Sequence, residues 1–453
     1  MLRPNGRQLA CYASRAPKVR KGTIASHGLG RLEGGGRGSS RNGFFVRHLE
    51  NRAKYGIQSN ISVEVFERQS YEKYIERAGA WGMALHWSTP NVEACLPPKL
   101  FEQLQTAQTD PWTVLTDEDA KTIPMVNGKT GELLTYVKAE GPRRVHRGRL
   151  RDLFRNGVDV HFGMELTDFS VEGDIVTARF NNGSEARKGF YLVGADGPRS
   201  KVRSFLVPPG SSELHPSPLT VFNFGYSFTA EQARYLRSTI HPIATLGPHP
   251  DQNTYFFLTR KPCLQTIFVV TGNSDSILLV ADVPDPDKPE TWVFQLSLSL
   301  WNEGQQPETF EERVRIFKEL AANYCEPFKS VAEWVGEDVK ITLSDFSTWK
   351  KIQPWKNYNG RVTITGDAAH PMVPYRAQGL NNALEDAGQY VRAIVRVVNG
   401  EEDLASAIRS YDADAYKRGK NDVGISDAQM YACHHWDALQ KSSILADGFG
   451  KSE

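Results

Sequence analysis

The chain has 453 residues, more than a single ordinary hydrophobic core takes, so two domains with an additional tail are expected. A hydrophobic content of 40%, a charged content of 24% and a net charge of +1 are typical of a soluble globular protein and give no general attraction to nucleic acid. The sequence contains no run of about 18 apolar residues, so no membrane-spanning helix is predicted.

The five cysteines are widely spaced and form no CxxC pair, which favours reduced thiols in the cytoplasm over disulfides or a zinc site. The only histidine pair, His434-His435, is not predicted to bind metal, because neighbouring helical residues point in different directions.

Residues 1–32 carry Lys and Arg but no Asp or Glu, a composition typical of a mitochondrial transit peptide or of disorder. We expect residues 1–40 to be poorly ordered or aberrant. The glycine-rich stretch SHGLGRLEGGGRGSS follows no recognisable apolar strand and lacks a clean GxGxxG spacing, so it is not assigned as a pyrophosphate-binding loop. The N-terminus has either diverged, or its coding sequence is misassigned.

Three segments in the first half of the chain place polar side chains where strands end or helices begin. ISVEVFER alternates like a strand and ends at Glu67, the position of a ribose-binding acid in dinucleotide folds. In RRVHRGRLRDLF, Arg147 precedes a predicted helix and could meet a phosphate. In VGADGPRSKVR, a strand runs into a turn at Asp196, and Ser200 is a candidate helix cap. Each segment alone is also compatible with an ordinary surface or turn.

From about residue 219 to 346, strand-like segments with interleaved aromatic residues predict a second, β-rich domain. The stretch RVTITGDAAHPMVPYRAQGLNNALED, at 361–386, then returns to a strand, a loop and a helix. Asp367 follows the strand, where ligands bind in open α/β sheets. The helix from Leu380 presents N–H groups that favour an anion or an electron-rich carbonyl.

These motifs, above all GDAAHPMVPYRAQGLNNALEDA and GADGPRSKVR, resemble those of the class A FAD-dependent monooxygenases of the para-hydroxybenzoate hydroxylase type. The fungal members that act on polyketides and other secondary metabolites are most similar. The resemblance runs from about Phe44 to about residue 440. One departure is Ala377, which stands where the family has glycine and is expected to be tolerated.

The resemblance implies an α/β fold: an FAD-binding Rossmann-like domain of the glutathione-reductase type, with an inserted β-rich substrate domain and a helical C-terminus. The FAD-binding domain would comprise residues 41–70, 141–207 and 346–398. Residues 71–140 and 208–345 would form the substrate domain and connecting segments, and residues 399–453 the C-terminal helical segment.

The resemblance also implies a role for each matching residue. Glu67 would bind the adenosine ribose, Arg147 the pyrophosphate region, and Asp367 the ribityl or pyrophosphate part of FAD. Asp196 would support the handling of both FAD and NAD(P)H. The remaining residues would lie near the flavin or on its edge: Ala80, Gly82, Pro374, Gly379, Leu380 and Asn381. No metal ligand is predicted.

The implied activity is that of an FAD-dependent monooxygenase that uses NAD(P)H and O2 to hydroxylate or epoxidise an aromatic or polyketide-like small molecule in secondary metabolism. Tyr226 is the candidate for a base or hydrogen-bond donor to a phenolic substrate, with Tyr255 as second choice, although both could simply pack the sheet. Two alternatives stay open: a Baeyer–Villiger-type oxygenase on the same flavin, and a degenerate flavoprotein with impaired FAD binding. A flavin halogenase is disfavoured because no WxWxIP-type motif occurs.

Overall fold

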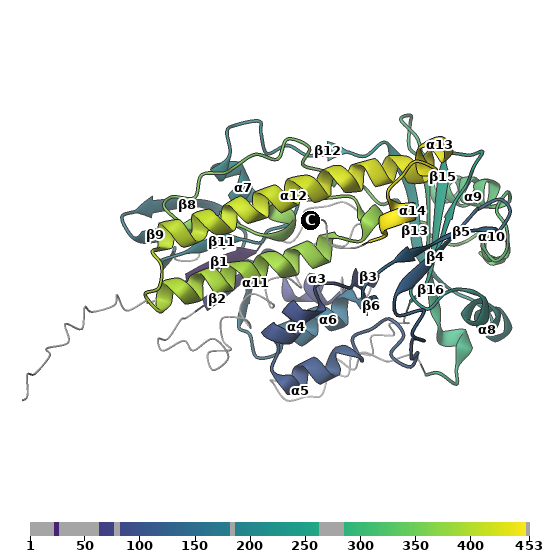
Figure 1. Cartoon of the computed structure of the whole chain (residues 1–453), viewed down its shortest axis with the longest axis horizontal. Helices are drawn as coiled ribbons and strands as arrows, with labels where there is room; N and C mark the ends of the chain where they lie inside the picture. The colour runs from purple at the N-terminus through teal and green to yellow at the C-terminus, as the bar shows by residue number, and fades with distance from the viewer. Residues whose placement is uncertain (1–21, 27–62, 77–81, 182–185, 262–284, 450–453) are drawn as a thin grey trace, which may run out of the picture.

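The computed structural model describes residues 22–26, 63–76, 82–181, 186–261 and 285–449. The molecule is elongated, with a parallel sheet toward one end and a larger, mostly antiparallel sheet at the other (Figure 1). Two long helices, α11 (Gly379–Val398) and α12 (Leu404–His434), lie side by side and antiparallel: α11 runs toward the first end, and α12 returns toward the second (Figure 1). The architecture is therefore the α/β fold with a β-rich second lobe and a helical C-terminus that the resemblance implied.

The parallel sheet has five strands in the order β18-β11-β1-β2-β7, so its neighbours come from segments far apart in the chain. Its strands are β18 (Val362–Ile364), β11 (Leu192–Gly194), β1 (Gly22–Ser26), β2 (Val63–Glu67) and β7 (Val160–Phe162). Parallel strands all end at the same edge, which brings Glu67, Asp196 and Asp367 to one side of the lobe.

Strand β1 corrects the expectation that no strand precedes the glycine-rich stretch. Its residues GTIAS pair in parallel with β2 on one side and β11 on the other. A central parallel strand usually contains a continuous apolar run, and this segment has a single large aliphatic residue. Hydrogen bonding to a neighbouring strand on each side stabilises β1, although its own sequence has few of the apolar residues typical of a central strand. The glycines that follow, and the helix predicted from Phe44, lie outside the described residues.

Three smaller sheets flank or link the two lobes. An antiparallel sheet of order β10-β9-β8 lies beside the parallel one, and two-stranded pairs β3-β6 and β12-β17 lie between the lobes. Their bounds are β8 (Leu166–Glu172), β9 (Ile175–Phe180), β10 (Arg187–Gly189), β3 (Gly82–Leu85), β6 (Arg143–His146), β12 (His215–Pro216) and β17 (Ser347–Thr348).

The larger sheet has six strands in the order β13-β16-β15-β14-β4-β5. They are β13 (Leu219–Ser227), β16 (Val293–Trp301), β15 (Thr254–Lys261), β14 (Thr245–Pro248), β4 (Thr122–Val126) and β5 (Leu133–Lys138). One face packs on α8 (Ala230–Thr239), α9 (Phe310–Ala321) and α10 (Phe328–Trp334), where Phe222, Phe256 and Phe317 are fully buried. The other face is turned toward the first lobe, so it can serve as the roof of a site.

The remaining helices are short. They are α3 (Tyr71–Glu76), α4 (Thr89–Cys95), α5 (Pro98–Phe101), α6 (Arg147–Arg155), α7 (Lys201–Leu206), α13 (Trp436–Leu439) and α14 (Ile444–Asp447). The part of the chain that the structure describes also contains four single turns of 3-10 helix: η2 (Glu102–Leu104), η3 (Pro289–Thr291), η4 (Gly366–Ala368) and η5 (Pro374–Arg376).

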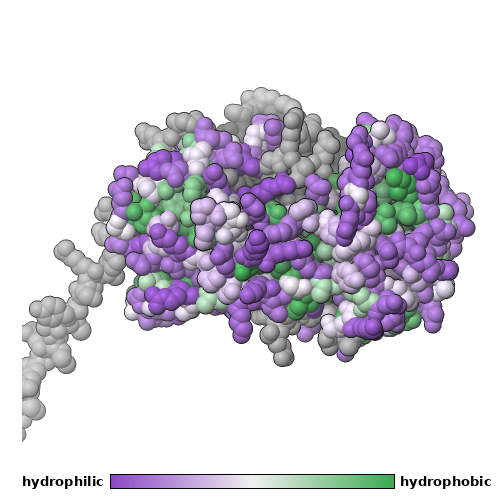
Figure 2. Space-filling model, turned by 90° about the horizontal axis from the view of Figure 1, so that it is seen from above, coloured by the Kyte–Doolittle hydropathy of each residue, from purple (hydrophilic) through white to green (hydrophobic). Residues whose placement is uncertain are grey.

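The surface viewed in Figure 2 is hydrophilic over most of its area, with hydrophobic patches that are small and separated. No helix of the described part of the chain is long and apolar enough to cross a membrane. Within the same residues, no cluster of three or more His, Cys, Asp or Glu side chains could hold a metal ion. Cys95, Cys325 and Cys433 are free thiols.

Candidate active site

A cavity of about 300 Å³ opens between the two lobes. One side is formed by the loop after β18, the start of α11 and the β3-β6 pair. The opposite side is the inward face of β13, β15 and β16. Six predicted cofactor residues line it: Gly82, Arg147, Asp367, Pro374, Gly379 and Leu380. Segments separated by up to about 300 residues thus converge on one space.

The start of α11 is built to present its backbone to this cavity. Its N-cap residue, Gln378, makes no capping hydrogen bond. The Gln378 side chain instead accepts a hydrogen bond from Trp87 Nε1 at 2.8 Å and donates one to the Phe449 carbonyl at 2.8 Å. The first turn of the helix, with Gly379 and Leu380 on the cavity wall, therefore keeps its positive end toward the open space.

Asn381 does not line the cavity, but its side chain hydrogen-bonds to the backbone of two segments beside it. Its Oδ1 accepts from the backbone N–H of His86 at 3.0 Å, and its Nδ2 donates to the carbonyls of Ala84 at 3.2 Å and Ala377 at 3.0 Å. The side chain is fully buried. It joins the end of β3 to the turn before α11, which gives Asn381 a positioning role.

The turn that carries Asp367 depends on a residue that the sequence analysis did not select. Asp386, in α11, is fully buried and accepts from the Gly366 N–H at 2.7 Å, from His370 Nε2 at 2.7 Å and from Arg418 at 2.6 Å. Burial alone would raise the pKa of Asp386, but His370 and Arg418 outweigh it and hold that pKa below its ordinary value. A charged residue on the apolar face of a predicted helix was the available signal.

Glu67 and Asp196 are buried at the carboxyl edge of the parallel sheet but do not line the cavity. Glu67 Oε1 accepts from the backbone N–H of Gln69 at 2.9 Å. Asp196 accepts from the N–H groups of Lys201 at 2.6 Å and Val202 at 3.0 Å, and from the Ser200 hydroxyl. Asp196 therefore stabilises the start of α7, which is what an ordinary strand-to-helix turn requires. Ala80 lies outside the described residues.

Tyr226 lies on the opposite face of the six-stranded sheet from the cavity. Its ring packs on Phe228, and its hydroxyl accepts from the Gly336 N–H at 3.1 Å. Side chains alternate between the two faces of a strand, and Asn223, three residues earlier in β13, is the one that faces the cavity. Tyr255, the second choice, does line the cavity. The sequence pattern could not distinguish the faces, because aromatic residues occupy both.

A hydrogen-bonded chain leads away from the cavity beside Tyr255. The Tyr375 hydroxyl contacts Ser299 Oγ at 3.0 Å, and Ser299 Oγ lies 2.8 Å from His434 Nε2. His434 Nδ1 is 2.7 Å from the Met430 carbonyl, which can only accept, so Nδ1 carries the proton and Nε2 is the acceptor. Burial lowers the pKa of His434 to about 4, which keeps this histidine neutral. The donor order is therefore Tyr375 to Ser299 to His434, and Tyr375 presents an acceptor lone pair to the cavity.

Comparison with known proteins shows which family this chain resembles. The sequence profile of the FAD binding domain family matches residues 143–424. An FAD-dependent monooxygenase of Penicillium herquei is 31% identical over 399 residues, covering 86% of this chain and 90% of the relative. An FAD-dependent monooxygenase of Talaromyces islandicus is 29% identical over 389 residues, covering 86% and 91%.

Solved structures share the fold. A salicylate hydroxylase in complex with its substrate superposes with a TM-score of 0.64 at 13% identity, over 95% of this chain and 94% of the other. Klebsiella pneumoniae HpxO in complex with FAD and uric acid gives a TM-score of 0.62 at 16% identity, over 94% and 92%.

Proposed function

The chain belongs to the FAD-dependent monooxygenases that contain the FAD binding domain, and from this premise we propose that it hydroxylates an electron-rich aromatic or polyketide-like small molecule. The observation that carries the proposal is the meeting of two unlike walls in one cavity. The start of α11 forms one wall, and the polar, aromatic face of the six-stranded sheet forms the other.

The cavity residues fit FAD at the first wall. The α11 N-terminus, whose N-cap makes no capping hydrogen bond, suits the electron-rich edge of a flavin ring, and Arg147 and Asp367 suit the pyrophosphate and hydroxyl groups. When bound and reduced by NAD(P)H, FAD supplies the activation of O2 and the transfer of one oxygen atom. We propose that Glu67 binds the ribose at the same sheet edge and that Pro374 borders the ring.

Tyr375 takes the role that the sequence suggested for Tyr226. A substrate hydroxyl that donates to Tyr375 becomes more electron-rich, which activates the ring carbon next to it toward oxygen transfer. Ser299 and His434 hold the Tyr375 proton on the side away from the substrate. The apolar side chains around them, among them Ile243, Leu246 and Phe346, exclude water from this end of the cavity.

The proposal is tested by purifying the protein, recording its visible spectrum and measuring NAD(P)H and O2 consumption with a panel of phenols and anthraquinone-like compounds. We expect a flavin spectrum, substrate-stimulated NAD(P)H oxidation, and a product that has gained one oxygen atom from ¹⁸O2. Asp367→Ala should lose the flavin, whereas the exposed Asp287→Ala should keep it. A colourless protein that FAD does not reconstitute would instead support the degenerate flavoprotein.

A second chemistry on the same cofactor is Baeyer–Villiger-type oxygen insertion, and product structure separates the two. Hydroxylation leaves the carbon skeleton intact, whereas insertion converts a ketone to an ester or lactone. We further propose a cytoplasmic location, which agrees with the free thiols of Cys95, Cys325 and Cys433.

A further inference from the structure

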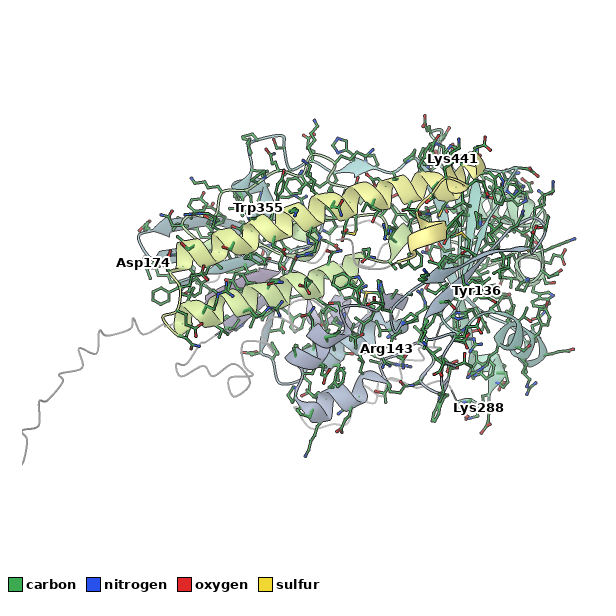
Figure 3. All side chains as sticks on the ribbon, in the orientation of Figure 1. Tyr136, Arg143, Asp174, Lys288, Trp355 and Lys441 are labelled. Carbon is green, nitrogen blue, oxygen red and sulfur yellow. The ribbon has the colours of Figure 1, made fainter. Side chains whose placement is uncertain are left out.

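Arg144 is a buried cation on the wall of the cavity. It lies in β6 opposite Ala84 of β3, and only 6% of its surface is exposed. Its labelled neighbour in the strand, Arg143, lies between the two lobes in Figure 3. A buried guanidinium is costly unless an anion or several hydrogen bonds compensate it.

The described part of the chain supplies no carboxylate for Arg144. Nη2 donates to Gln295 Oε1 at 2.8 Å, the guanidinium lies 4.9 Å from the centre of the Phe257 ring, and Nε is buried without a hydrogen-bond partner. Burial lowers the pKa of Arg144 to about 9, with no opposing charge to restore it. At this pKa the side chain is still predominantly cationic at neutral pH.

Three partly buried arginines elsewhere in the molecule have acidic partners, whereas the fully buried Arg203 donates to backbone carbonyls, among them those of Ala368 and Ser212. Arg237 and Arg260 share Asp110, at 3.0 Å and 3.5 Å, and Arg418 bonds to Asp386 at 2.6 Å. Arg144 has one hydrogen bond and no carboxylate within the described residues, so its charge is compensated less than in these arginines. The charge of Arg144 is left facing the cavity, where a ligand can reach it.

The Arg144 side chain is held in place before any ligand binds. Gln295, which accepts from it, donates in turn to Asn223 Oδ1 at 3.1 Å, and both residues line the cavity. Gly82 provides the room on the other side, because a Cβ there would lie 2.8 Å from Arg144 Nε. A cation fixed in this way loses little conformational entropy on binding an anion.

We propose that Arg144 is a specificity-determining residue that binds an anionic group of the substrate, a carboxylate or an ionised phenol or enol. This inference rests on the proposed function. Gln295 and Ser299 lie on the same face of β16, four residues and therefore about 13 Å apart. Arg144 contacts the first and Tyr375 the second, so one substrate spans from the anion site to the hydroxyl site. That spacing favours a multi-ring acidic aromatic compound.

The test uses pairs of probes that differ in charge but not in shape: 4-hydroxybenzoate with its amide, and 4′-hydroxybiphenyl-4-carboxylate, whose carboxylate and hydroxyl lie at opposite ends, with its amide. Binding to the FAD-containing protein is followed by the change in the flavin spectrum and, independently, by calorimetry. We expect the wild type to prefer the carboxylate in at least one pair, and Arg144→Met to reduce that preference by about ten- to a hundredfold. Arg144→Lys should keep part of it, and Arg315→Met, which removes an exposed charge on α9, should keep all of it.

Three results would overturn the inference. The first is a wild type that binds neither carboxylate, or that prefers neither over its amide. The second is an Arg144→Met variant with unchanged preference, and the third is an Arg144→Met variant that shifts the flavin midpoint potential without altering anion binding. The last result would assign Arg144 to the flavin instead. Failure of the proposed function looks different, because it removes the flavin spectrum or the oxygenated product whatever the charge preference. The flavin spectrum of ligand-free Arg144→Met also reports whether the variant is folded.

Discussion

The side-chain amide of Asn381 donates a 3.0 Å hydrogen bond to the carbonyl oxygen of Ala377, and Ala377 is held in the left-handed region with φ 54°. The fold accommodates alanine at this position, as expected, but in a strained conformation. The Cβ of a non-glycine residue makes the left-handed region unfavourable by about 1–2 kcal/mol. The hydrogen bond to Asn381 and the packing of the turn hold the strained residue in place.

Ala377→Gly should therefore raise the free energy of unfolding by up to about 1 kcal/mol, because relief of strain exceeds the added freedom of the unfolded chain. Urea denaturation measures the difference. Ala413→Gly, at an exposed site in the interior of α12, is the matched control and should lower stability by about 1 kcal/mol. Equal losses from both substitutions would show that Ala377 is not strained.

Two glycines in α12 should respond in opposite ways to alanine. A Cβ on Gly419 would lie 2.6 Å from the Cβ of His370, whereas one on Gly424 would meet nothing within 4 Å. Gly419→Ala should push α12 away from the His370–Asp386 pair and weaken the support of the Asp367 turn. We expect it to lower the melting temperature and the affinity for FAD. Gly424→Ala should raise helix stability by about 1 kcal/mol and leave FAD affinity unchanged. Stabilisation by both would contradict close packing at Gly419.

The Tyr375–Ser299–His434 chain predicts that substrate activation and flavin reduction can be separated. Tyr375→Phe removes the acceptor that faces the cavity, so we expect a fall of about ten- to a thousandfold in product formation from a phenol. NAD(P)H oxidation should fall much less. Product per NAD(P)H consumed is the quantity to measure. Tyr226→Phe is the matched control, because its hydroxyl bonds Gly336 on the far face of the sheet. An equal loss in both variants would remove Tyr375 from the mechanism.

The parts of the site that the sequence predicted are those carried by local strand-to-helix patterns. Asp367, Gly379 and Leu380 belong to one continuous stretch, and the order of its residues alone places them at a sheet edge and a helix start. Strand β1 was not predicted, because its stability comes from the neighbouring strands on both sides rather than from its own five residues. Arg144 and Tyr375 were not selected from the sequence for a different reason. Their importance comes from partners about 150 and 75 residues away, Gln295 and Ser299, and no local pattern reports such pairs.

Asp412 predicts how stability depends on pH. Burial raises the pKa of Asp412 to about 6, although hydrogen bonds from Thr363 and Asn357 oppose the shift. The unfolded chain has a pKa of about 4 for aspartate, so between pH 4 and pH 6 the folded state binds more protons than the unfolded state. The contribution of Asp412 to stability therefore falls as pH rises through this window, and the penalty is complete above pH 6.

Asp412→Asn should remove this dependence. The free energy of unfolding of the variant, minus that of the wild type, should increase by about 1–3 kcal/mol between pH 4 and pH 7 and then level off. Any strain from the new amide beside Asn357 adds a constant offset and leaves the slope unchanged. Urea denaturation at five or so pH values measures the difference, and Asp437→Asn, at an exposed site in α13, controls for the loss of one charge. A difference that stays flat, or that decreases with pH, would mean that Asp412 is ionised in the folded protein throughout this range.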